Sequence, residues 1–375
     1  MGVHHGVILG LLRDYGPLSR AELARRTQLS ATALTNLMAQ LLEDGCVEEV
    51  KEDARVGVGR PPVALGLRDA SYRALGVHIG GGRGQIVLCN LRTEALASAT
   101  FCYEVGATTP DEVVTLIANQ LENLLAMSGS AHDRIIGVGF AVPGPVDKAQ
   151  RRALFCAAAG WKDVSFAQML EEQINLPVVL EHNVSAMAQR DSRYGLGKNS
   201  DALLYLYLRS GVGAGLVVEG KPFRPGGIGT VELGHIPVAN GPGCACGAEG
   251  CLEALVGEAA LRRALGIKDG EILDDPLFVL VDREPQVRAD VLRYLEHALV
   301  SAINMLSVDF VVLGGHLAAA PQSFIAVLET RVKQRVLAHA RQRLRIVGST
   351  LDSNLGGLGA ASVALDHFFY SGAFK

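Results

Sequence analysis

Residues 74–91, "ALGVHIGGGRGQIVLCNL", contain two aliphatic runs that are separated by a glycine-rich turn. Short apolar runs that end at glycines are typical of buried strands. The same order returns in residues 202–223, "ALLYLYLRSGVGAGLVVEGKPF". Buried strands that end in glycine turns also recur in residues 134–147, "RIIGVGFAVPGPVD", and in residues 309–317, "DFVVLGGHL". Two similar mixed β/α halves predict a duplicated α/β fold with a ligand-binding cleft between the halves.

The bulk composition excludes several classes of protein. A length of 375 residues predicts two or three domains, and a formal net charge of −4 gives no overall field that attracts nucleic acid or membranes. Residues 1–16 lack the pattern of a secretory signal, and no apolar run approaches the roughly eighteen residues of a membrane span. We therefore expect a cytoplasmic protein without membrane insertion.

The first 70 residues differ from the rest and predict three short helices followed by a hairpin. Ser19 and Glu22 fit a capping box at the start of the second helix, and Ser30 can cap the third. The third helix has an apolar face at helical spacing, made of Leu34, Leu37, Met38, Leu41 and Leu42. Strand-like runs at 47–51 and 63–67 follow, with a Gly/Pro-rich segment between them. This pattern predicts a winged helix-turn-helix over residues 1–70.

A winged helix-turn-helix places the polar face of its recognition helix in the major groove of DNA. Thr32, Thr35 and Asn36 are the predicted contacts to base edges. Arg20 and Ser30 lie near the turn, where phosphates would pass, and Arg60 lies at the predicted wing. The alternative is an ordinary three-helix packing module. Residues 1–67 favour that alternative in one respect, because they hold seven basic and eight acidic residues, whereas DNA-binding domains are usually basic.

A cluster of cysteines in residues 241–255, "GPGCACGAEGCLEAL", predicts a metal site. Together with the preceding histidine, it supplies one imidazole and three thiols, from His235, Cys244, Cys246 and Cys251. This set suits tetrahedral zinc, and four protein ligands leave no open position, so the ion would be structural. The alternative is three buried free cysteines in a glycine-rich loop. The other four cysteines lie in apolar runs and are expected in the core, at Cys46, Cys89, Cys102 and Cys156.

The motifs "IGVGFAVPGPVD", "VGAGLVVEG", "VELGHIPV", "CACGAEGCLEAL" and "VVLGGH" resemble, in order and spacing, those of the ROK family. That family contains sugar kinases and sugar-responsive repressors with an actin-like, hexokinase-type fold related to ribonuclease H. The resemblance covers residues 74–365, and the front end resembles the winged helix of the repressor branch. It implies an effector-binding and dimerisation domain over 71–375. Its lobes would be 71–182 plus a C-terminal helix at 357–369, and 183–356.

The resemblance also implies a sugar-binding grip, formed by Glu232, His235 and Glu253 with His182 and Asn183 beside them. Carboxylates accept several hydroxyl hydrogen bonds, which suits vicinal diols. In a family of this kind the four clustered ligands carry zinc, which would fix one ring nitrogen of His235 and leave the other toward the ligand. The alternative is that Glu232 and Glu253 are plain surface carboxylates.

Several departures from the kinase pattern predict that the chain is not an enzyme. The resemblance places Asn183 at the position of the catalytic aspartate of ROK kinases. An amide cannot act as a general base. By the same resemblance, His78 stands where the kinase branch has the aspartate of its first phosphate loop, and His316 stands where a glycine of the third is usual. Residues 157–159, three alanines, stand where a sugar contact is usual. The effector is therefore expected to be a sugar, a modified sugar, a phosphosugar or a less polar molecule, unless none binds.

We accordingly predict a transcriptional regulator, a repressor in its usual form, that binds operator DNA as a homodimer or a dimer of dimers. A sugar-like effector in the zinc-supported cleft would shift the DNA-binding heads. One alternative is a ROK sugar kinase with an altered active site. The other is a regulator controlled by a protein partner, such as a component of a transport system.

Overall fold

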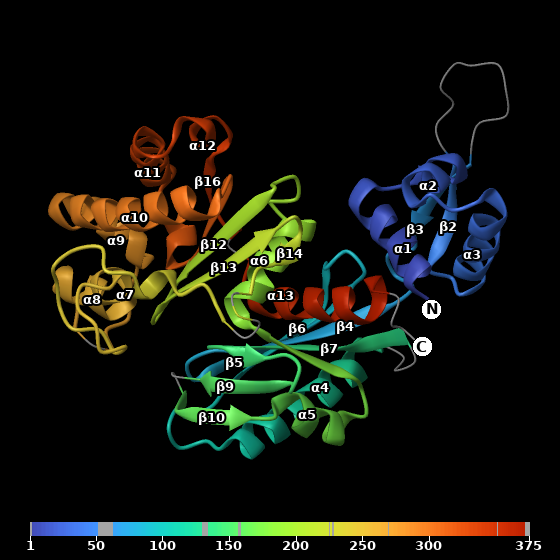
Figure 1. The fold of residues 1–375 in the computed structure, drawn as a ribbon. Coiled ribbons are helices and arrows are strands. Elements are labelled where there is room, and N and C mark those ends of the chain that lie inside the picture. The colour runs from blue at the N-terminus through green and yellow to red at the C-terminus, as the bar shows by residue number, and fades with distance from the viewer. Residues whose placement is uncertain are drawn as a thin grey trace.

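The structure, a computed structural model, describes residues 2–51, 63–129, 134–156, 159–224, 226, 229–268, 270–350 and 352–371. Arg60 and the alanines at 157 and 158 lie outside the described residues. Figure 1 shows two sheets flanked by helices, with a smaller blue unit, here called the head, at one end. Within the described residues, no helix is both long and apolar enough to cross a lipid bilayer.

The head contains three helices and a small sheet. Its elements are α1 (Val3–Tyr15), β1 (Leu18–Ser19), α2 (Arg20–Thr27), α3 (Ala31–Glu43), β2 (Val47–Lys51) and β3 (Val63–Leu67). The strands are antiparallel in the order β1-β3-β2. Only one of the two hydrogen bonds of the predicted capping box of α2 is present. The Ser19 side chain accepts from the backbone N–H of Glu22, while the Glu22 carboxylate accepts from Arg25 and Arg26 instead of returning to the backbone.

The first sheet contains β4 (Arg73–Ile79), β5 (Arg83–Asn90), β6 (Ala95–Cys102), β7 (Ile135–Val142) and β11 (Val178–His182), in the order β11-β7-β4-β5-β6. Helices α4 (Pro110–Ser128) and α5 (Phe166–Ile174) bury their apolar faces against it. A separate small sheet contains β8 (Val146–Asp147), β9 (Arg152–Cys156) and β10 (Trp161–Val164). Cys102, which was expected in the core, is exposed at the end of the β6 strand, so that prediction was wrong.

The second sheet repeats the first. It contains β12 (Ala202–Leu208), β13 (Val212–Val218), β14 (Lys221–Pro222), β15 (Phe310–Gly315) and β16 (Arg345–Gly348), in the order β14-β13-β12-β15-β16. In each sheet a central strand joins an antiparallel hairpin on one side and parallel strands on the other. The repetition read from the glycine turns is therefore present in the fold.

Helices cover the outer side of the second sheet and build a large apolar core against it. They are α7 (Leu252–Val256), α8 (Glu258–Ala264), α9 (Leu277–Arg283), α10 (Pro285–Leu306), α11 (Gln322–Arg335) and α12 (Ala338–Arg343). Short 3-10 turns, η4 (Leu233–His235) and η5 (His316–Ala319), carry two of the histidines discussed below.

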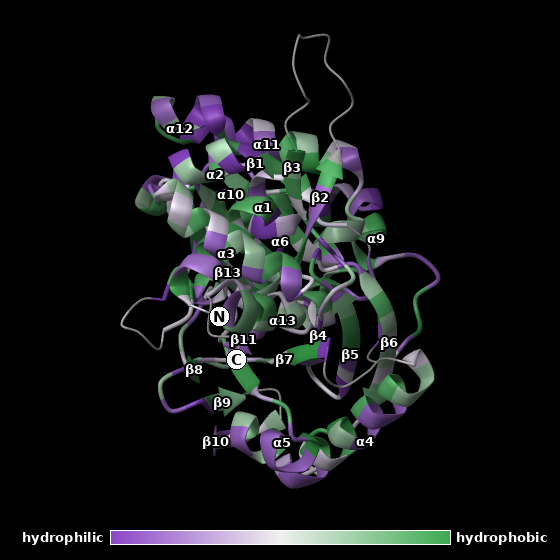
Figure 2. Ribbon diagram, turned by 90° about the vertical axis from the view of Figure 1, so that its right-hand side faces the viewer, coloured by the Kyte–Doolittle hydropathy of each residue, from purple (hydrophilic) through white to green (hydrophobic). Residues whose placement is uncertain are grey.

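Two helices lie between the sheets. These are α6 (Asn183–Tyr194) and α13 (Leu355–Ala364), and α13 continues into a π-helix, η6 (Leu365–Tyr370). Every residue of α13 is buried, and the helix is hydrophobic along its length (Figure 2). It lies directly on the first sheet, since a Cβ added to Gly139 of β7 would lie 1.8 Å from the Ala360 carbonyl oxygen. The predicted C-terminal helix is therefore correct in place, but it begins two residues earlier than expected.

Candidate metal centre and effector cleft

The clustered cysteines are brought to His235 by short-range backbone pairing. Pro237 pairs with Cys251 in an isolated bridge, which places the start of α7 beside the end of η4. Between them the chain turns back on itself, because the Cys244 N–H donates to the Ala248 carbonyl at 2.7 Å. This turn brings the intervening thiols to the same side as Cys251.

The four side chains form a compact donor set. Their ligand atoms all lie within 4.8 Å of one another. The His235 Nδ1 lies 3.5 Å from the Cys244 Sγ, and the Cys246 Sγ lies 3.7 Å from the Cys251 Sγ. Tetrahedral zinc, with Zn–S near 2.3 Å and Zn–N near 2.0 Å, would separate its ligand atoms by about 3.5 to 3.8 Å. The cluster could therefore hold a metal ion, and its chemistry is that of a zinc site.

The thiols differ in their tendency to ionise. Burial raises the pKa of the Cys251 thiol, because a thiolate there loses its hydration. The backbone N–H of Ala248 instead lowers the pKa of Cys246, which is exposed. A bound cation would supply the charge that a buried Cys251 thiolate needs, so metal binding at this cluster releases protons.

Two carboxylates flank the cluster along the chain. Glu253 lies in α7, and its Oε2 accepts from the backbone N–H of Val212 at 2.8 Å. Glu232 comes directly before η4 and accepts a hydrogen bond from the Thr230 hydroxyl. Within the described residues, the second oxygen of each carboxylate has no hydrogen-bond partner. Both carboxylates can therefore accept further hydrogen bonds, for example from hydroxyl groups.

The end of β11 supplies the other predicted effector residues. His182 is the last residue of that strand and is 8% exposed, and its Nδ1 lies 3.1 Å from the Ser185 Oγ. Burial lowers the pKa of His182, although the nearby charges of Glu181 and Glu232 act in the opposite direction. Burial therefore favours the neutral form of the His182 imidazole, against the charge of Glu232 from the other half of the fold. Asn183 opens α6, and its side-chain oxygen accepts from the Val184 N–H at 2.8 Å.

Sequence reasoning missed a buried ion-pair group at this point. Glu181 is 2% exposed, and its carboxylate accepts from Lys148 at 2.8 Å and from Arg224. It also accepts from the His182 backbone N–H at 2.9 Å. Burial acts to raise the pKa of Glu181, but the charges of Lys148 and Arg224 outweigh it and hold the pKa below its usual range. The signal in the sequence was a carboxylate at the end of an aliphatic strand, because such a charge must be paired.

The structure also places His78 and His316, which the resemblance predicted to stand at positions of kinase motifs. Burial lowers the pKa of His78 on β4 to about 4, and the charge of Arg209 acts in the same direction. A neutral imidazole cannot replace a carboxylate as a magnesium ligand. His316 opens η5, and its Nε2 lies 3.1 Å from an oxygen of Glu258.

In the head, the predicted base-contacting residues lie on the exposed side of α3. Thr32, Thr35 and Asn36 are exposed, while Leu34 and Met38 of the same helix are buried. The Thr35 hydroxyl donates to the Ala31 carbonyl at 2.8 Å, so part of its capacity is used within the helix.

The other predicted DNA contacts are partly engaged. The Ser30 side chain accepts from the Ala33 N–H at 3.2 Å and caps α3. Arg20 pairs with Glu49 at 3.2 Å, and both side chains are largely exposed. Ion pairs that are this exposed contribute little to stability.

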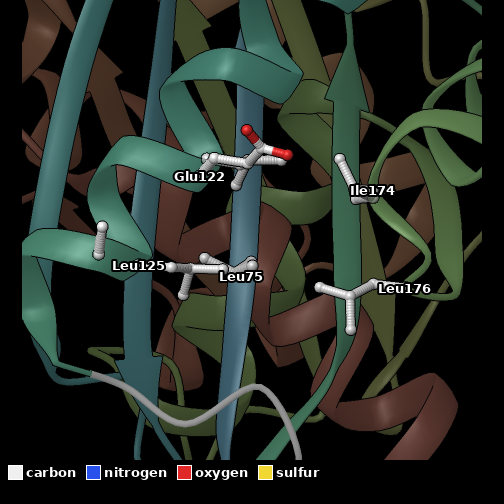
Figure 3. A pocket seen from close by; sticks show the side chains of 7 residues that line it. Leu75, Glu122, Leu125, Ile174 and Leu176 are labelled. Atoms are coloured by element: carbon white, nitrogen blue, oxygen red, sulfur yellow. The ribbon is translucent and has the colours of Figure 1, made fainter.

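Cavities occur elsewhere in the described chain. One, of about 290 Å³, lies between α4, α5 and the first sheet (Figure 3). Its lining is apolar apart from Glu122 and includes Leu75, Leu125, Ile174 and Leu176. Another, of about 330 Å³, lies between Val238 and α10, with His297 and Ser301 in its lining. The candidate effector residues line neither cavity. The case for their site therefore depends on the positions and hydrogen-bond partners of their polar atoms.

Comparison with known proteins finds sequence similarity over most of the chain. The sequence model described as "ROK family" matches residues 74–367. The xylose repressor of Bacillus subtilis (strain 168) is 24% identical over 371 residues, covering 98% of this chain and 96% of that protein. The DNA-binding transcriptional dual regulator NagC of Escherichia coli (strain K12) is 24% identical over 371 residues, covering 93% and 89%.

Solved structures agree with the fold. The crystal structure of a ROK family transcriptional regulator, a homolog of the E. coli MLC protein, gives a TM-score of 0.83 at 23% identity, over 99% of this chain and 96% of that chain. A ROK hexokinase from Thermus thermophilus gives a TM-score of 0.63 at 26% identity, over 77% of this chain and 97% of that chain. These likenesses confirm the predicted two-halved α/β fold.

Proposed function

This chain belongs to the ROK family, and we propose that it is a transcriptional repressor that binds operator DNA through its head and senses a sugar or sugar derivative in the cleft. The observation that carries this proposal is the exposed polar face of α3 in the head. The match to named repressors runs over nearly the whole chain and so includes the head. The hexokinase structure covers only 77% of the chain, and the family match begins at residue 74, after the head.

We infer that the head is a winged helix-turn-helix. Helix α2 ends at Thr27, Gln28 takes a left-handed conformation with φ 57°, and Ser30 then caps α3. This is the short turn between two helices that the motif requires. The antiparallel pair β2 and β3 follows, and its register joins Lys51 to Val63 across the base of the predicted wing. Helix α3 would then present Thr32, Thr35 and Asn36 to base edges, with Arg20 and Ser30 near the phosphates. Arg60 is the proposed wing contact and lies outside the described residues.

We infer that the cleft binds hydroxyl-rich molecules. The second carboxylate oxygens of Glu232 and Glu253 can accept hydrogen bonds from hydroxyl groups, and the amide nitrogen of Asn183 can donate one to a hydroxyl oxygen. His235 presents its Nδ1 to the thiols, which leaves Nε2 for the ligand, and His182 adds a neutral imidazole. A structural zinc would hold η4 and α7 together, and with them the residues on either side of the loop.

We propose that the chain is not a working kinase. The position expected for a catalytic base holds Asn183, whose oxygen is already bonded to the backbone of α6. The first phosphate loop carries a neutral His78 in place of an acidic magnesium ligand. A phosphoryl transfer site needs both a base and a bound magnesium ion, so neither half of that chemistry is supplied.

Operator binding by a head of this kind is ordinarily symmetric, and we propose a homodimer or a dimer of dimers in the cytoplasm. The test is selection of genomic fragments by the purified protein, followed by sequencing. The proposal is supported if the selected fragments share a palindromic site and a sugar releases the protein from that site. Enrichment no greater than that of sheared control DNA at several salt concentrations, with and without sugars, would overturn it. A transport-system protein that releases the operator where no sugar does would favour control by a protein partner.

A further inference from the structure

Helix α1 of the head carries a buried arginine that reaches into the effector domain. Arg13 is 5% exposed. Its guanidinium donates to Asp14 at 2.7 Å and to Asp366 of η6, also at 2.7 Å. The guanidinium carbon also lies 4.4 Å from the ring centroid of Tyr370, a cation–π contact. One face of the head is therefore fixed to the C-terminal segment through an arginine that is almost entirely buried.

The same carboxylate is held from a second side by α6. The other oxygen of Asp366 accepts from the Gln189 Nε2 at 2.8 Å. Arg193, one turn further along α6, lies 3.6 Å from that oxygen through its Nε. Asp366 therefore joins α1 of the head to the C-terminal half of α6, with one oxygen for each.

The opposite end of α6 lies at the candidate effector site. His182 precedes the helix and Asn183 is its first residue. A helix rises 1.5 Å per residue, so the six residues from Asn183 to Gln189 correspond to a rise of about 9 Å along α6 between the two sites. Figure 1 shows α6 and α13 together between the sheets, with α13 extending toward the head.

Helix α6 has little room to absorb a displacement along its length. A Cβ added to Gly359 of α13 would lie 3.0 Å from the Met187 backbone nitrogen, so the two helices are in backbone contact there. On the other side, Val184 and Met187 pack in a core with residues of the second sheet. Close-packed elements of this kind move as units between discrete arrangements.

We propose that Arg13, Asp366 and Gln189 form a coupling joint, through which a change at the Asn183 end of α6 resets the position of the head. The inference rests on the proposed function, because it assigns regulation to the same cleft and head. The apolar core shared by α1, α13 and η6 holds the head in place, and the polar joint sets its orientation. Gln189 and Arg13 are positioning residues, since neither lies at the cleft or on the exposed face of α3.

The test is a double-mutant cycle between the two ends of α6. Asn183→Ala changes the cleft end, and Gln189→Met removes the donor to Asp366 at nearly constant volume. The readouts are amide hydrogen exchange of residues 3–15 and the affinity for a selected operator fragment. We expect Asn183→Ala to change the amide exchange rates of α1 by about threefold or more in the wild-type background. In the Gln189→Met background, the same substitution should leave those rates unchanged.

The outcomes separate the joint from the wider function. If Asn183→Ala leaves α1 exchange unaltered, or alters it equally in both backgrounds, the joint is refuted. If the wild-type protein binds no DNA fragment, the proposed function fails, while hydrogen exchange still decides the joint. Asp366→Asn serves as a second variant should Gln189→Met unfold the chain. Gln168→Met, an exposed glutamine on α5, is the matched control and should leave α1 exchange unchanged.

Discussion

Arg224 donates to the carboxylate of Glu181, and the two residues belong to different halves of the fold. Arg224 follows β14 of the second sheet, whereas Glu181 lies in β11 of the first. The carboxylate also accepts from the backbone of His182, a candidate effector residue. This ion pair therefore links the two halves of the fold directly beside the strand end that carries His182 and Asn183.

Replacing Glu181 by glutamine should destabilise the protein by about 2 kcal/mol, because Lys148 and Arg224 lose their buried partner. Urea unfolding at neutral pH measures the change. The same variant should weaken binding of any sugar that the wild type accepts. Glu172→Gln, an exposed carboxylate on α5, is the control. A loss for Glu181→Gln no larger than that of the control would mean that the ion pair is not stabilising.

His78 predicts a specific dependence of stability on pH. Its pKa is about 4 in the folded protein, against an ordinary value of 6.5. The unfolded chain therefore binds more protons between these values, and stability is lost as pH falls from about 6.5 to 4. His78→Gln should flatten urea-unfolding free energies across that window, whereas His4→Gln, on the exposed start of α1, should not. Equal slopes for wild type and His78→Gln would refute the assignment.

Purified protein should contain about one zinc per chain by elemental analysis, held by the His/Cys cluster. Cys251→Ser should remove the metal and increase hydrogen exchange in residues 235–255, since the loop loses its crosslink. Cys102→Ser changes an exposed thiol outside the cluster and should retain the metal. Metal content far below one equivalent in protein prepared without chelator would contradict the site.

Asn36→Ala should weaken operator binding about tenfold, because one amide contact to a base edge contributes on the order of 1–3 kcal/mol. A gel shift at fixed salt measures the change, and the melting temperature should stay the same because Asn36 is exposed. Asn123→Ala, an exposed asparagine on α4, is the control. Operator affinity unaltered by Asn36→Ala would argue against α3 as the reading helix.

Wild-type protein should show no sugar-dependent ATP turnover with glucose, xylose or N-acetylglucosamine. Asn183→Asp alone should not restore turnover, because the neutral His78 still supplies no magnesium ligand. A coupled ADP assay measures this, with a ROK hexokinase as the positive control. Turnover by the wild type, or by Asn183→Asp alone, would support the alternative of an altered sugar kinase.

Much of the fold was readable from the sequence because its signals are local. The apolar spacing on α3 and the serine before it depend on neighbours within a few residues, and both predictions were confirmed. The repeated strand–turn–strand units also proved correct. The donor atoms of the metal cluster come from residues at most sixteen positions apart, so spacing alone could predict it.

The sequence by itself determined the two-halved fold, the polar face of α3 and the donor set of the metal cluster. Only the tertiary structure decided that Arg224 meets Glu181 and that Arg13 meets Asp366, 353 positions away in the chain. No periodicity links such residues, because their contact depends on how helices and sheets pack. Burial then gives those contacts their importance, since a charge withdrawn from water must find a partner wherever the fold places one.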